Sequence, residues 1–370
     1  FAWMYLLPNN FADFAKSILS TLAFVSNFYF YFIGESYWGD NSLQPFLHTW
    51  SLAVEEQFYV IGPIVIVLLF KFFRSYVLII FIAGALLSLL AADLGSIYAK
   101  SLTFYSLPTR AWELLAGSIL AKLELRYERK HFGIVNQILP ILGLFLIFYY
   151  FIYIFNVIKL NEEIIHPSFT TALPVIGTML IIWFSHKDDL AGKILSSQIF
   201  VKVGLISYSL YLWHSPIFTF NDYVGFVQKD ASGKILLVFL AIVLSTLTFL
   251  FIEQPFRNKS KIILSRLLIY LSASLLLLTS VSACVVYKDG FKKRYNTVYE
   301  NIFGKELLRL KKNTKFNLIK TYYSEERLKF KKKNGIPDFI NDDKKNILIV
   351  GNSHAVDLFH IFKLNENLID

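Results

Sequence analysis

The 370-residue chain has a single cysteine, Cys284, and few charged side chains. One cysteine excludes an intrachain disulfide and a cysteine-based zinc site, and we expect no metal. Charged residues make up 17% of the chain, whereas a soluble globular protein carries about 25%. Hydrophobic residues reach 55%, and the mean hydropathy is +0.50. This balance excludes an ordinary soluble domain and indicates a membrane protein.

Long apolar runs dominate the first three quarters of the sequence. A helix that crosses a bilayer needs roughly 20 apolar residues. Eight segments approach this length: 54–70, 75–92, 107–123, 138–155, 170–184, 203–220, 235–252 and 266–287. Residues 15–32 are apolar but interrupted by serine and asparagine, so we expect them to lie at the interface or to re-enter rather than to span. The predicted fold is a polytopic all-α membrane protein with about eight spans and one interfacial segment.

Lysine and arginine gather in alternate loops, which sets the predicted orientation. The four basic loops hold Lys71 and Arg74, then Lys122, Arg126, Arg129 and Lys130, then Lys187, Lys193 and Lys202, then Arg257, Lys259, Lys261 and Arg266. Basic loops face the cytoplasm. We therefore expect His48, Arg110, His214 and the C-terminal region on the outer side.

The chain divides into four predicted parts. Residues 1–265 form the helical membrane domain, 266–287 a linking transmembrane helix, and 288–345 a polar connector outside the membrane. The net charge is +10, but the lysine run 329–333 lies in this connector without a defined fold, so we expect no nucleic-acid partner. From residue 346 a buried-strand pattern leads into Gly351 and Ser353. Such a turn lifts a serine hydroxyl above a sheet, where it can act as a nucleophile.

The stretch 47–59 reads LHTWSLAVEEQFY and places ionisable groups at the start of an apolar run. Ionised groups inside a membrane are costly and usually have a chemical or transport task. In a continuous helix, one face would carry Trp50, Val54 and Gln57, and another would carry His48, Leu52, Glu55 and Tyr59. One interpretation is an outward-opening polar pocket that orients a substrate hydroxyl or a catalytic base. The other is that Glu55 and Glu56 are buried ion-pair partners of arginines such as Arg110; both can hold together.

Two further segments present polar groups on the predicted outer side. Arg110 and Glu113 are three residues apart and can pair locally, or Arg110 can bind a phosphate or a carbonyl oxyanion. His214 follows tyrosine and tryptophan residues typical of a membrane interface. A capping or anchoring role and a catalytic role both fit this histidine.

Four ordered motifs, LHTWSLAVEEQFY, LPTRAWELLAG, ISYSLYLWHSP and FIEQPFR, resemble the acyltransferase family 3 membrane proteins over nearly all of residues 1–260. The sequence ILIVGNSHA resembles the start of a fused SGNH-hydrolase domain, an α/β fold, at residues 346–370. That architecture is typical of bacterial O-acetyltransferases that modify surface polysaccharide such as lipopolysaccharide O-antigen or peptidoglycan.

The resemblance implies a membrane O-acyltransferase and a division of labour. The membrane domain would carry an acyl group, usually acetyl from cytoplasmic acetyl-CoA, across the bacterial inner membrane. The periplasmic domain would pass it through its serine to a glycan hydroxyl. The candidate catalytic residues are Ser353, Glu55, Glu56 and His48. The candidate substrate-binding residues are Trp50, Gln57, Arg110, Glu113 and His214.

The motif set is incomplete at both ends. The catalytic histidine of the family, with an arginine about ten residues before it, belongs to a helix that would precede Phe1. The rest of the SGNH triad would follow Asp370. We therefore expect this chain to be a fragment, with acyl-CoA, membrane lipid and a surface glycan as the partners of the whole protein.

Two other function classes compete with the acyltransferase. A polytopic transporter would use the intramembrane charges as a substrate or proton path, but such proteins often have inverted repeats, and no repeat is evident. An outer esterase anchored by the helices would need only one span, and would leave Glu55, Glu56 and Arg110 without a task.

Overall fold

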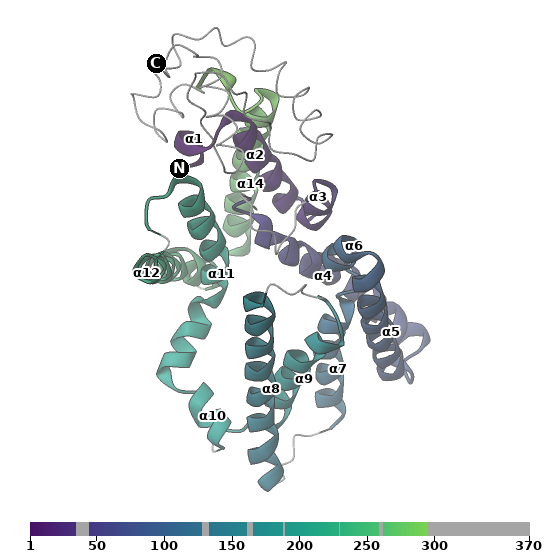
Figure 1. Ribbon diagram of the computed structural model, residues 1–370. Coiled ribbons are helices and arrows are strands. Elements are labelled where there is room, and N and C mark those ends of the chain that lie inside the picture. The colour runs from purple at the N-terminus through teal and green to yellow at the C-terminus, as the bar shows by residue number, and fades with distance from the viewer. Residues whose placement is uncertain are drawn as a thin grey trace, which may run out of the picture. The chain divides into compact units, whose positions relative to one another are not determined.

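The computed structural model describes residues 1–34, 44–127, 133–160, 166–187, 189–228, 230–258 and 262–294 (Figure 1). These residues form helices joined by turns, and no β-strand occurs among them. They belong to two compact units. One is Ala12–Lys288, and the described part of the other consists of residues 1–11 and 289–294. The predicted strand at 347–350, Ser353 and the connector lie outside the described residues.

Five predicted spans are confirmed as helices long and apolar enough to cross a membrane. They are α4 (Trp50–Phe72), α5 (Val77–Tyr98), α8 (Ile134–Lys159), α12 (Ala231–Thr248) and α14 (Leu264–Tyr287). A π-helical turn, η3 (Phe249–Glu253), continues α12 into the short α13 (Gln254–Arg257). Apolar helices of this length satisfy their own backbone hydrogen bonds, which hydrocarbon cannot do.

The other three predicted spans are helical but shorter or more polar. They correspond to α7 (Ala111–Arg126), to α9 (Ala172–Phe184) with the preceding 3-10 turn η2 (Phe169–Thr171), and to α11 (Gln198–Val224). The helix α7 has 16 residues and begins four positions later than expected, because the segment around Pro108 forms a turn. That these three helices also cross the membrane stays a prediction.

Residues 15–32 form two short helices instead of one span. These are α2 (Pro8–Leu22) and α3 (Ser26–Phe32), separated at Phe24, whose φ is +55°. L-residues rarely adopt a positive φ, and a helix cannot continue through one. An interfacial location for this segment stays a prediction.

Short elements complete the described chain. They are α1 (Ala2–Tyr5), η1 (Leu47–Thr49), α6 (Lys100–Tyr105), α10 (Leu190–Leu195) and η4 (Lys292–Arg294). Asp189 and Asp230 begin α10 and α12 as N-caps, with Oδ1 accepting from the amides of Gly192 at 2.6 Å and Gly233 at 2.7 Å. The amides at a helix start need such acceptors.

Within Ala12–Lys288, α8 packs against α9, α5 against α7, and α11 against α12 (Figure 1). The α8–α9 contact is closest at two glycines. A Cβ added to Gly143 would lie 2.4 Å from the carbonyl oxygen of Gly177, and one added to Gly177 would lie 2.5 Å from that of Gly143. The two backbones therefore touch, as small residues allow at membrane helix interfaces.

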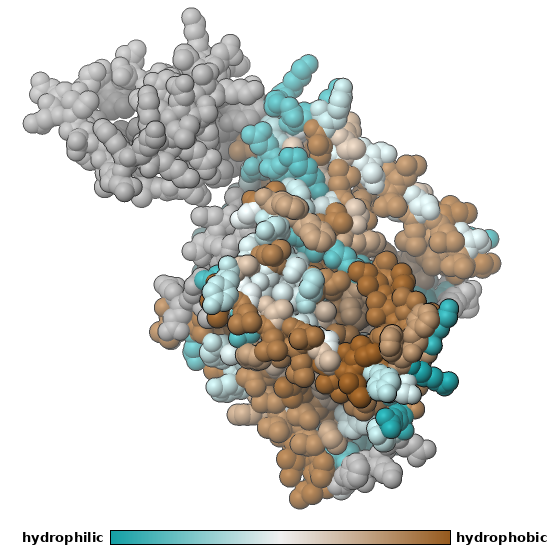
Figure 2. Space-filling view, turned by 90° about the vertical axis from the view of Figure 1, so that its right-hand side faces the viewer, coloured by the Kyte–Doolittle hydropathy of each residue, from teal (hydrophilic) through white to brown (hydrophobic). Residues whose placement is uncertain are grey.

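Large apolar side chains point outward from the long helices. Phe151 on α8 is 70% exposed, Phe251 after α12 is 72% exposed, and Leu276 on α14 is 70% exposed. Figure 2 shows a face on which hydrophobic residues cover most of the described surface. A soluble protein rarely exposes apolar area on this scale, whereas a bilayer would cover it.

The smaller unit is organised around the buried Arg294. Its guanidinium lies over the rings of Trp3 at 5.0 Å and Phe11 at 4.3 Å. It donates to the backbone carbonyl of Trp3, and to that of Leu6 at 2.7 Å. Residues just after α14 are thereby fixed to the first eleven residues.

Candidate functional site

A small pocket lies between α4 and the start of α7. Its volume is about 60 Å³, and its lining consists of Trp50, Ser51, Val54, Glu55, Arg110, Glu113 and Leu114. The spacing explains the lining, because residues three or four apart lie on one side of a helix. The structure thus brings together four predicted site residues: Trp50, Glu55, Arg110 and Glu113.

Arg110 is buried in this pocket and is fixed by several polar and aromatic contacts. Its side chain is almost fully enclosed, and the residue is 5% exposed. Nη1 donates to Glu113 Oε1 at 2.9 Å and Nε donates to the carbonyl oxygen of Phe104 at 3.3 Å. The guanidinium also lies 5.0 Å from the Trp50 ring and 5.1 Å from the Phe104 ring. A buried cation is costly unless it is paired, and here a carboxylate and two aromatic faces compensate it.

One arm of this guanidinium remains unused. Arg110 Nη2 is buried and has no hydrogen-bond partner among the described residues. Arginine carries five N–H donors in a fixed planar arrangement. Since the side chain lines a pocket, Nη2 can donate to a ligand oxygen there. Both interpretations of Arg110 are therefore compatible, because the local pair with Glu113 leaves a donor available.

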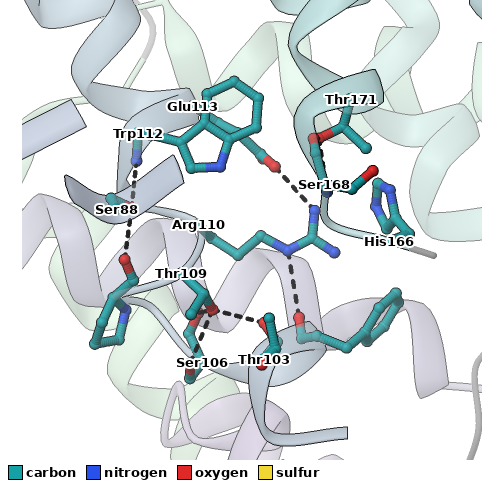
Figure 3. A network of polar contacts seen from close by, with 12 residues as sticks. Ser88, Thr103, Ser106, Thr109, Arg110, Trp112, Glu113, His166, Ser168 and Thr171 are labelled. Atoms are coloured by element: carbon teal, nitrogen blue, oxygen red, sulfur yellow. Dashed lines mark hydrogen bonds and ion pairs between the residues drawn. The ribbon is translucent and has the colours of Figure 1, made fainter. Parts of the chain in front are cut away.

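The turn that carries Arg110 is fastened to the helices around it (Figure 3). Ser88 on α5 donates to the carbonyl of Pro108 at 2.5 Å and accepts from the amide of Trp112 at 3.1 Å. Thr109 Oγ1 donates to the carbonyl of Thr103 at 2.6 Å. These bonds fix the backbone on both sides of Arg110 and so preorganise its donors.

His166 is a neighbour of this site that sequence reasoning missed. Figure 3 shows the Arg110 guanidinium reaching toward the turn that carries His166 and Ser168. The His166 ring lies 5.8 Å from the Phe104 ring. Burial, and then the positive charge of Arg110, lower the pKa of His166 to about 3. The only signal in the sequence is the HPSFTT segment, whose Ser168 and Thr171 form a capping box before α9.

His48 lies in the 3-10 turn η1, immediately before the start of α4. The ring is 5.1 Å from the ring of Tyr211 and 5.3 Å from that of His214. Both predicted histidines therefore meet, in a cluster of their own that also contains Tyr211.

Hydrogen bonds settle the protons in this histidine cluster. His214 Nδ1 lies 2.7 Å from the carbonyl oxygen of Tyr211 and must be the donor, which leaves Nε2 as the basic nitrogen. Both ring nitrogens of the buried His48 lack a hydrogen-bond partner of normal geometry among the described residues, although the Pro45 backbone lies near the ring.

Ser51 and Tyr211 connect the pocket with the histidine cluster. The Tyr211 hydroxyl donates to the backbone carbonyl of His48 and lies 2.7 Å from Ser51 Oγ. Because the tyrosine proton is already used, Ser51 donates to the tyrosine oxygen. Ser51 was not expected in the site, because nothing in the sequence places this serine opposite α11.

Two further predicted site residues lie outside the pocket lining, as the two histidines do. Gln57 Nε2 donates to Asn27 Oδ1 and to the carbonyl of Phe24, each at 2.9 Å. A substrate-binding role for Gln57 stays a prediction, and its amide connects α4 with the break between α2 and α3. Glu56 is half-buried beside Glu55 but does not contribute to the lining.

The comparisons with known proteins agree with these motifs. Residues 1–254 match the acyltransferase domain family, acyltransferase family 3. The chain belongs to this family of membrane acyltransferases.

Among its relatives is a protein of Staphylococcus aureus strain MRSA252 that is named as a candidate O-acetyltransferase. It is 26% identical over 98% of this chain and 61% of its own length. The peptidoglycan O-acetyltransferase OatA of Listeria monocytogenes is 29% identical over 65% of this chain and 40% of its own length. The O-acetyltransferase OatA of Staphylococcus aureus strain NCTC 8325 is 28% identical over 66% and 41%. The chain thus spans less than two thirds of each of these relatives. No solved structure matches it.

Proposed function

We propose that the whole protein is a membrane O-acyltransferase. In this proposal, it takes an acetyl group from a cytoplasmic acyl-CoA and passes it across the membrane to a hydroxyl of a bacterial surface polysaccharide. Family membership and relatives named as O-acetyltransferases support the enzyme class. The name of the Listeria relative favours peptidoglycan over O-antigen as the acceptor.

The observation that supports this proposal is the buried, unpaired Nη2 of Arg110, a residue that lines the pocket. When a nucleophile attacks a thioester, the carbonyl oxygen becomes negatively charged. A preorganised donor aimed at that oxygen stabilises the transition state more than the ground state. Arg110 is held by Glu113, Phe104 and two aromatic rings, so it can do this without moving.

Proton transfer is assigned to the histidine cluster. The acceptor hydroxyl must lose a proton as its oxygen attacks, and a neutral imidazole nitrogen is a suitable base. His214 Nε2 has its lone pair free for this because Nδ1 is bound to the Tyr211 carbonyl. Ser51 and Tyr211 join this cluster to the acyl pocket, and Glu55 supplies a carboxylate at the pocket itself.

The outer half of the reaction is proposed from the sequence. Ser353, outside the described residues, would receive the acetyl group and transfer it to the glycan. The basic loops support the outward direction. In this arrangement the C-terminal region is periplasmic and the membrane helices contact lipid.

Arg110→Lys tests the proposed role of the pocket. Lysine keeps the charge but lacks the planar fork, so it cannot bind Glu113 and a carbonyl oxygen together. We expect glycan O-acetylation by cells expressing the intact variant to fall roughly 10²- to 10³-fold, the usual cost of one lost oxyanion donor. Arg126→Lys, on the exposed end of the same helix, is the matched control and should retain activity.

The same assay covers the outer step. Ser353→Ala should abolish acetylation of the glycan while the protein stays in the membrane. If Arg110→Lys is inserted normally and acetylates glycan as well as Arg126→Lys does, Arg110 does not act on the acyl group and the proposal loses its main support.

A further inference from the structure

Part of the pocket lining is apolar. It consists of Val54 on α4, Leu114 on α7 and the Trp50 ring. Val54 is 4% exposed and belongs to the buried cluster around Trp50, Phe104 and Phe30, so it has little freedom to move aside. A ligand group that enters the pocket therefore meets both charged side chains and hydrocarbon, part of which is tightly packed.

The volume of the pocket limits what can enter. An apolar cavity of about 150 Å³ holds one benzene molecule, which has six carbon atoms. The pocket here has a volume of about 60 Å³, which by the same measure suits roughly two to three non-hydrogen atoms. An acetyl group has three: its carbonyl carbon, its oxygen and its methyl carbon. A propionyl group has one carbon more.

The charges around the pocket act against acidic acyl groups. Glu55 and Glu113 both line it, and Arg110 is already paired with Glu113 at 2.9 Å. An acyl chain that ends in a carboxylate would add a third negative charge beside one guanidinium. A neutral carbonyl needs only the free Nη2 donor.

We propose that Val54 and Leu114 are the specificity-determining residues that restrict the transferred acyl group to acetyl. This inference rests on the proposed acyltransferase function. The carbonyl oxygen accepts from Arg110 Nη2, and the methyl group contacts Val54 and Leu114. During transfer the carbon–sulfur bond of the thioester breaks and a carbon–oxygen bond to the acceptor forms. The proton lost by the acceptor hydroxyl ends on the released thiol.

The test compares acetyl-CoA with propionyl-CoA in membranes that contain the intact protein, with mass spectrometry of the acylated glycan as the readout. One extra methylene in a tight apolar pocket typically costs 10- to 200-fold in rate, so the unmodified protein should prefer acetyl by about that factor. Val54→Ala and Leu114→Ala should each raise the propionyl-to-acetyl ratio by about tenfold or more. Leu114→Val, a smaller change, should raise it by a few fold.

Matched controls are available on the same two helices. Val60 on α4 is 65% exposed and Leu125 on α7 is 83% exposed, so Val60→Ala and Leu125→Ala should leave the ratio unchanged. If the ratio for Leu114→Val and for either alanine variant stays within twofold of the controls, the pocket does not select the acyl chain. If the unmodified protein transfers neither acyl group, the proposed function itself fails.

Discussion

Alanine at Gly143 should destabilise the helical bundle through one backbone contact. The added Cβ would lie 2.4 Å from the carbonyl oxygen of Gly177 and 2.9 Å from Ile181 Cγ1. Both distances are far below a normal contact, and the carbonyl is part of the α9 backbone, so α8 and α9 must separate. Overpacking of this kind costs about 1–3 kcal/mol.

The stabilising effect of alanine inside a helix is smaller than this overpacking cost. Replacing glycine by alanine inside a helix favours folding by about 0.5–1 kcal/mol, because alanine restricts the unfolded chain. The contact therefore outweighs the helix preference over nearly all of both ranges, and the net loss should be about 0–2.5 kcal/mol. At roughly 2–4 °C per kcal/mol, the midpoint of thermal unfolding should fall by up to about 10 °C.

Two other helical glycines serve as controls. A Cβ at Gly117 on α7 or at Gly204 on α11 meets no atom within 4 Å. Gly117→Ala and Gly204→Ala should therefore be neutral or slightly stabilising. The measurement is the fraction of detergent-solubilised protein that stays monodisperse after heating, followed by size-exclusion chromatography.

The two glycines of the contact offer a second check. Gly143→Ala and Gly177→Ala disturb the same approach of α8 to α9, so their effects should not add in the double variant. A melting temperature for Gly143→Ala equal to that of Gly204→Ala would refute the close backbone contact. So would strict additivity with Gly177→Ala.

Two further predictions concern the polar groups near the site. Tyr211→Phe removes the bond to the His48 carbonyl and leaves Ser51 without its partner, so it should cost about 1–3 kcal/mol of stability and lower acetyl transfer. The control is Tyr208→Phe, because Tyr208 is 54% exposed on the same helix. Equal acetyl transfer by the two variants would contradict a role for the link between Ser51 and Tyr211. For His166 the pKa of about 3 lies below the ordinary 6.5, so the unfolded chain binds a proton that the folded protein excludes, and stability should fall as the pH drops from about 6.5 toward 3. At pH 5 this loss of stability amounts to about 2 kcal/mol. His166→Gln should therefore make the melting temperature less dependent on pH between 7 and 5 than in the unmodified protein. An identical pH dependence in the two proteins would show that His166 is not held neutral.

Much of the helical framework was predictable because hydrocarbon imposes it. A segment inside a bilayer must satisfy its backbone internally and be apolar for about 20 residues, and α4, α5, α8, α12 and α14 follow this rule. For residues 15–32 the sequence indicated only an apolar segment interrupted by polar residues, and not the position of the break between α2 and α3. Its cause is a contact distant in sequence, because Gln57 on α4 holds the carbonyl of Phe24.

The candidate site was predictable in part. Arg110 and Glu113 pair as their spacing indicated, and Trp50 and Glu55 join them in the pocket. The continuous helix expected from His48 to Tyr59 was right only from Trp50 onward, because residues 47–49 form a 3-10 turn. Hydropathy does not register such a turn, since both conformations bury the same side chains.

The amino-acid sequence by itself determined which segments are helical, which carry intramembrane charge, and to which family the motifs belong. These properties are local, since they follow from composition and from residue spacing along one helix. Tertiary packing decided that His166 lies beside Arg110, that Ser51 contacts Tyr211, and that Trp50 and Glu55 meet Arg110 in one pocket. Such contacts join residues far apart in the chain, and their free energies depend on neighbours that no single segment contains.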